Sequence, residues 1–75
     1  MPTLYNKDAL IIEMRLKEAG HKVPHVHALY QGESVSIDFN GKVIIGKIKQ
    51  KQQDIACQWV ASHKFELQQL WKEMH

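Results

Sequence analysis

Asn40 and Gly41 form the strongest short hairpin signal in the chain, because both residues accept the positive φ angles of a type I′ turn. In the segment before them, SVSIDF, the apolar residues Val35, Ile37 and Phe39 alternate with polar ones. The segment after them, KVIIGKI, is expected to be the returning strand. The chain is therefore expected to contain an antiparallel sheet built around this turn.

The segment ALIIEMRL, residues 9–16, has the two-residue period of a half-buried strand. Leu10, Ile12, Met14 and Leu16 would then share one face of the sheet. A helix is the rival interpretation, with Asp8 as its N-cap, and helix propensity alone slightly favours it. We favour the strand because the alternation of apolar and polar residues is clean.

The segment HVHALYQ, residues 25–31, also alternates, and Pro24 before it suits the start or the edge of a strand. His25 and His27 would lie on one face, and Val26 and Ala28 on the other. A tight turn at residues 31–33 would lead into the strand that precedes the Asn-Gly hairpin. These segments predict three or four antiparallel strands connected as a meander.

From Gln50 onward the chain contains no Gly or Pro, and its apolar period changes to about 3.6 residues. On a helical wheel, one arc of about 160° collects both tryptophans and most of the apolar residues. Phe65 and Cys57 fall outside this arc. We therefore expect either one long helix with Phe65 exposed, or a break near residues 62–64 that divides it into two.

Together the segments predict an α+β fold in a single domain, 1–75, with the sheet over residues 3–48 and the helical part over residues 50–74. One face of the antiparallel meander would be covered by the long C-terminal helix or helix pair. The expected core residues are Ile12, Met14, Val35, Ile37, Trp59, Val60, Leu67, Leu70 and Trp71.

The overall composition excludes several classes of protein. The longest apolar run, ALII, is too short to cross a bilayer, and Cys57 as the single cysteine excludes an internal disulfide framework. Since the N-terminus has no signal-peptide pattern either, we expect a soluble cytoplasmic protein with no membrane partner. The net charge of +2 and the pI of about 8.8 permit a nucleic-acid ligand without arguing for one.

Three histidines, His21, His25 and His27, fall within seven positions. Three imidazoles suit Zn²⁺ with one coordination position open, and Glu13 or Glu33 would then act as base or fourth ligand. Without a metal, the second and third histidines could serve as base and acid in RNA cleavage. Because His-x-His alone lacks the ligand count of a metal site, we favour a structural or binding role on a solvated or edge face, and we expect no cofactor.

Lys47, Lys49 and Lys51 would line one side of the last strand if that strand continued beyond Ile48. Such a row would present a ridge to the phosphate groups of a nucleic acid. The alternative is an ordinary solvated strand end, in which the lysines discourage pairing with other strands. We favour this alternative and keep the three lysines as the nucleic-acid candidates.

Three stretches, HKVPHVHALYQGE, GKIKQKQQDIACQWVASHKFEL and LWKEM, together resemble the small prokaryotic domain-of-unknown-function family numbered 4160. The resemblance spans nearly the whole chain. Val23 stands where the family commonly has the first of two prolines, and the proline often seen before the helix is absent. The matching positions are Pro24, His25, His27, Ala28, Tyr30, Glu33, Trp59, His63, Lys64, Glu66, Leu67 and Trp71.

The resemblance implies a genetic context and no established activity. Members often sit beside a second small protein in toxin–antitoxin-like arrangements and are then usually labelled the toxin side. We therefore expect an interaction module from a toxin–antitoxin-like or mobile-element context that binds a small, antitoxin-like protein. Nucleic acid and self-association stay open as further interactions. The expected binding surface comprises His21, His25, His27, Tyr30 and Glu33.

Two other functions stay open beside the interaction module. The first is a nuclease or hydrolase, with or without a metal, in which His25 and His27 are the catalytic candidates. The second is a phage- or plasmid-encoded inhibitor of a host nucleoprotein complex. We expect a binding protein rather than an enzyme, because no spacing in the sequence defines a complete catalytic site.

Overall fold

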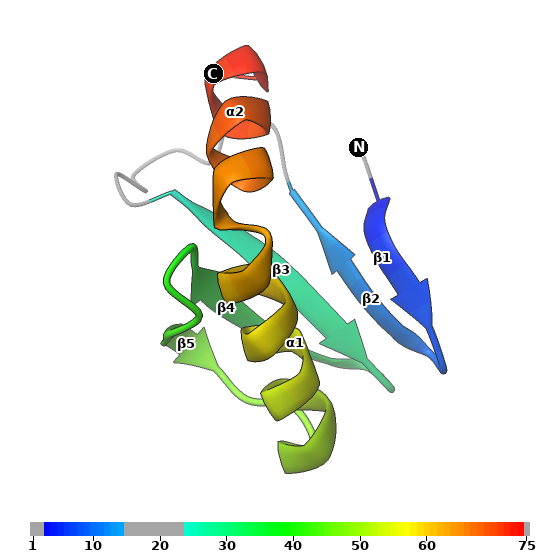
Figure 1. Ribbon diagram of the computed structural model, residues 1–75. Coiled ribbons are helices and arrows are strands. Elements are labelled where there is room, and N and C mark those ends of the chain that lie inside the picture. The colour runs from blue at the N-terminus through cyan, green and yellow to red at the C-terminus, as the bar shows by residue number, and fades with distance from the viewer. Residues whose placement is uncertain (1–2, 15–23, 75) are drawn as a thin grey trace.

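The computed structural model describes residues 3–14 and 24–74 (Figure 1). One antiparallel sheet has its strands in the order β1-β2-β3-β4-β5, and two helices follow it in the chain. The predicted α+β meander is therefore confirmed, but it has five strands rather than three or four. The elements are β1 (Thr3–Lys7), β2 (Leu10–Glu13), β3 (His25–Tyr30), β4 (Glu33–Asp38), β5 (Val43–Gly46), α1 (Gln50–Ser62) and α2 (Lys64–Met74).

The first strand, β1, is not apparent from the sequence. It pairs with β2 through a turn at Asp8 and Ala9, whose φ angles are 53° and 68°. Positive φ angles are uncommon at residues other than Gly, and Asp-Ala is not one of the residue pairs that indicate a hairpin turn. Asp8 thus belongs to a turn instead of capping a helix, and the strand interpretation is confirmed for Leu10–Glu13. Leu16, the last residue of the predicted strand face, lies outside the described residues. With β1 in place, β3 becomes the third of five strands.

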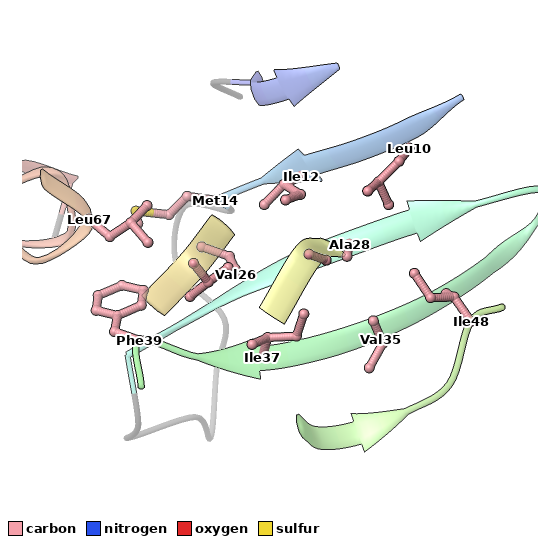
Figure 2. Close-up of a cluster of buried hydrophobic side chains, with 12 residues drawn as sticks. Leu10, Ile12, Met14, Val26, Ala28, Val35, Ile37, Phe39, Ile48 and Leu67 are labelled. Atoms are coloured by element: carbon pink, nitrogen blue, oxygen red, sulfur yellow. The ribbon is translucent and has the colours of Figure 1, made fainter. Parts of the chain in front are cut away.

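Side chains from the sheet and both helices form one apolar core (Figure 2). Residues with the predicted two-residue period, such as Ile12 on β2 and Ile37 on β4, point into the same layer. Three predicted core residues, Trp59, Leu70 and Trp71, are only partly buried and pack against this layer. The predicted core residues that are fully buried are Ile12, Met14, Val35, Ile37, Val60 and Leu67.

The helical part is a pair, in which α1 crosses one face of the sheet and α2 continues beyond it (Figure 1). His63 separates the two helices: its backbone N–H donates to the carbonyl oxygens of Trp59 and Val60. Its ring stacks on the indole of Trp59 with centroids 4.2 Å apart. The predicted break near residues 62–64 is confirmed, the single long helix is not, and Phe65 is 82% exposed although the helix breaks. Neither described helix is long and apolar enough to cross a membrane.

Candidate functional site

His25 and His27 lie on β3 with their ring centroids 5.0 Å apart. They alternate along the strand with Val26 and Ala28, which belong to the core, so the two rings project from the opposite face. Only 2% of His25 and 9% of His27 is exposed. The expectation of a solvated or edge position is therefore wrong, because β3 lies between β2 and β4 and both side chains are buried.

A row of polar side chains crosses the sheet at His27. Its register partners are Glu13 on β2 and Ser36 on β4, and the Ser36 Oγ lies 3.4 Å from the His27 Nδ1. Two residues before His27 on β3, His25 is the register partner of Asp38 on β4. Directly opposite residues have Cβ atoms about 4.5–5.5 Å apart, so these five side chains share one region of the sheet face.

Two members of this region also have structural contacts elsewhere. The His25 ring lies 5.8 Å from the ring of Trp71, which also packs edge-on against Phe39. The Asp38 Oδ1 accepts hydrogen bonds from the backbone N–H groups of Asn40 and Lys42, at 2.9 and 3.0 Å, and so shapes the β4–β5 turn. The described residues form no cavity beside these groups. The row therefore has the features of a buried polar network and lacks an open substrate site.

The metal hypothesis concerned His21, His25 and His27. His21 lies outside the described residues. Within residues 3–14 and 24–74, no three or more His, Cys, Asp or Glu side chains are grouped so that they could hold a metal ion. The metal-binding and catalytic roles of these histidines stay predictions.

Tyr30 and Glu33, the other residues of the expected binding surface, are register partners at the β3–β4 turn. Tyr30 packs against the core, whereas Glu33 is exposed. Alternation along β3 places Tyr30 on the face of Ala28 and opposite to that of His27. The structure thus divides the predicted surface between two faces, and its binding role stays a prediction.

The three candidate lysines do not continue the last strand. β5 ends at Gly46, where φ is 90°, and Lys47 follows in the connection to α1. Lys49 immediately precedes α1, and Lys51 lies in its first turn. All three side chains are exposed, but they do not form a single row along a strand. The predicted row of lysines along one strand is therefore wrong. Their binding to nucleic acid stays a prediction.

The sequence analysis did not single out the apolar surface of β5. Val43, Ile44 and Ile45 are 40%, 45% and 65% exposed, and we call these three residues the β5 patch. β5 is the last strand of the described sheet, so only β4 flanks it. A signal was present: a strand with one buried face alternates, whereas this run of three apolar residues does not.

Phe65 follows Lys64, the residue of α2 that contacts the β4–β5 turn. The Lys64 Nζ donates a hydrogen bond of 2.7 Å to the Oδ1 of Asn40, so the first turn of α2 is tied to the β4–β5 turn. The turn also packs closely on α1, because a Cβ added at Gly41 would lie 2.7 Å from the carbonyl oxygen of Cys57. Figure 1 shows the junction of the two helices beside this turn.

Cys57 has the chemistry of an inert thiol. Its side chain is half-buried on α1. Burial raises the pKa of the thiol, and the carboxylates of Asp54 and Asp38 raise it further. Because the thiolate is the reactive form, a raised pKa makes this residue a poor nucleophile.

Comparison with known proteins gives a match to the model of one family. The model of a family described as "Domain of unknown function (DUF4160)" matches residues 10–72, from the first residue of β2 into α2. No curated protein and no solved structure gives a significant match. The family description names no reaction, ligand or partner.

Proposed function

The chain belongs to this DUF4160 family, and we propose that it is a protein-interaction module that binds its partner along the β5 edge of the sheet. The observation that carries this proposal is the β5 patch: three consecutive large apolar side chains exposed on the last described strand. Proteins usually cover such edges or place charges on them, and an exposed apolar patch marks an interaction surface.

An edge strand offers a partner two kinds of contact. Its outward backbone N–H and C=O groups can pair with an added strand, and its side chains give that pairing specificity. Phe65, which follows Lys64 and is 82% exposed, adds a large aromatic side chain of the kind that anchors interfaces. The β5 patch and Phe65 together would form an apolar surface that a partner can cover.

We propose as partner the small protein encoded beside this chain in its genome. The support is the toxin–antitoxin-like context that the family resemblance implies, together with a surface suited to protein rather than to a small molecule. In this proposal the chain is the toxin-side component and acts in the cytoplasm. Its effect on the cell would depend on whether the β5 edge is covered.

The test is a pair of substitutions that add the same charge at two exposed positions. Ile45→Lys places a charge in the β5 patch, whereas Gln58→Lys places it on α1. Affinity for the co-expressed neighbouring protein should fall at least about tenfold for the first, since an apolar side chain of this size contributes about 1.5–3 kcal/mol when buried. Gln58→Lys should bind like the unchanged chain. Equal affinities for both variants would show that β5 is not the interface.

A second candidate function is a His-dependent enzyme, and the Glu13–His27–Ser36 row is the observation that favours it. The burial of His27 weighs against it. Replacing His25 and His27 by Ala together separates the two functions: loss of the cellular effect with partner affinity intact supports catalysis. For a metal-dependent version, less than about 0.1 equivalent of zinc retained after zinc challenge of untagged protein would exclude the site.

A further inference from the structure

The β5 patch has lysines at both of its ends. Lys42 immediately precedes Val43, and Lys47 and Lys49 follow Gly46; all three lysines are exposed. We infer, resting on the proposed function, that the partner segment bound at β5 is extended, with a β-branched apolar centre and acidic residues at both ends. The lysines at the ends of β5 would favour acidic residues at the ends of the bound segment, and the β5 patch would favour apolar residues at its centre.

The three lysines at these ends form no ion pair with the residues that the structure describes. Asp38 lies close to Lys42 in the chain, but its Oδ1 accepts the backbone N–H groups of Asn40 and Lys42. Carboxylates from a partner would therefore meet ammonium groups that form no ion pair with the described residues.

The same lysines argue against a second copy of this chain as the occupant. In antiparallel pairing of two β5 strands, Lys42 of one copy lies toward Lys47 of the other at both ends. In parallel pairing, each lysine lies beside its own equivalent. Like charges opposite one another destabilise a strand pair, so self-pairing is disfavoured in either direction. A segment with acidic ends is favoured in both directions.

The form of β5 limits the length of the bound segment. β5 has four residues, and its register with β4 is irregular, since Ile37 pairs with Val43 while Ser36 pairs with Ile45. A short edge, a bulge and flanking lysines are features that prevent indiscriminate pairing. Four residues at about 3.3 Å each span about 13 Å, so an apolar centre of four or five residues is sufficient.

The inference is tested with three fluorescein-labelled peptides that share the centre Val-Thr-Val-Thr-Val and carry two Glu, two Ser or two Lys residues at each end. Fluorescence anisotropy would measure their affinity for the full chain at about 50 mM salt, where exposed charges are weakly screened. The Glu-flanked peptide should bind about tenfold more tightly than the Ser-flanked one, and the Lys-flanked peptide should bind most weakly. Replacing Lys42, Lys47 and Lys49 by Gln should remove this ranking, whereas Lys72→Gln on α2 should preserve it.

Three results would overturn the inference. One is equal affinity for the Glu- and Lys-flanked peptides, and another is no binding by any of them. The third is a monomer–dimer equilibrium of the free chain in sedimentation that Ile45→Lys abolishes, because a second copy would then be the occupant. The proposed function has its separate test with the neighbouring protein. If the peptides fail while Ile45→Lys still weakens that complex, the inference about the bound segment is refuted and the proposed function is not.

Discussion

Replacing Gly46 by Ala should weaken the attachment of β5 to β4, and Gly32→Ala provides a matched control. Both glycines have φ angles in the left-handed region, at 90° and 80°. A Cβ at Gly46 would lie 2.5 Å from the carbonyl oxygen of Ser34 and 3.1 Å from the Cα of Val35, whereas one at Gly32 would meet nothing within 4 Å. The pair therefore separates conformational strain from steric overlap.

The magnitude follows from these two contributions. An Ala held at positive φ costs about 1–2 kcal/mol, and this is the full loss of unfolding free energy expected at Gly32. At Gly46 the overlap is with backbone atoms that cannot rotate away, and forced overpacking adds about 1–3 kcal/mol. The total of about 2–5 kcal/mol is large beside the stability of about 4–11 kcal/mol expected for a domain of 75 residues.

Urea unfolding measured by tryptophan fluorescence provides the assay, because Trp59 and Trp71 both pack against the core. The loss of unfolding free energy for Gly46→Ala should exceed that for Gly32→Ala by at least about 1 kcal/mol. Losses that agree within about 0.5 kcal/mol would refute the close approach of β5 to β4, and with it the position of the β5 patch.

Three further predictions concern the core, the thiol and the helix junction. Ile37→Ala should lower the unfolding free energy by about 2–5 kcal/mol in the same urea assay, because the side chain is fully buried; a loss below about 1 kcal/mol would contradict this. Alkylation of Cys57 by iodoacetamide should reach its half-maximal rate at a higher pH in the folded than in the urea-unfolded chain, because burial and two nearby carboxylates raise the pKa of the thiol. The thiol of the unfolded chain ionises at a lower pH than the thiol of the folded chain. The unfolding free energy should therefore fall as pH rises above the unfolded pKa of about 8.5–9, and Cys57→Ser should not show this fall. His63→Ala removes the stacked ring and the hydrogen bond of Nδ1 to a helix carbonyl, so it should cost about 1 kcal/mol in the urea assay, and an unchanged midpoint would contradict that role.

Much of the fold is predictable from local patterns. The two-residue period places Ile12, Val35 and Ile37 on the buried face, and Asn40-Gly41 marks the last hairpin. The predicted type I′ geometry is wrong, because only Gly41 of the pair has a positive φ angle. The change to a period of 3.6 residues marks the helices. β1 is different, because its turn at Asp8 and Ala9 uses positive φ angles that neither residue type indicates.

The site depends more on non-local arrangement. Alternation predicts that His25 and His27 share a face, but it does not predict that both side chains on this face are buried. The apolar run Val43–Ile45 is visible in the sequence, whereas its exposure follows from β5 being the last described strand. Strand order is the information that local patterns lack, and it places the β5 patch on the last strand of the described sheet.

The most direct test of the β5 interface is amide hydrogen–deuterium exchange of the chain with and without the neighbouring protein. Binding should slow exchange at Val43–Gly46 by about 100-fold or more, because the outward amides of β5 would then be hydrogen-bonded. Thr3–Lys7 in β1, the strand at the opposite end of the described order, provides the internal control and should be unchanged. Protection confined to β1 or to the helices, with exchange in β5 unaltered, would contradict the proposed interface.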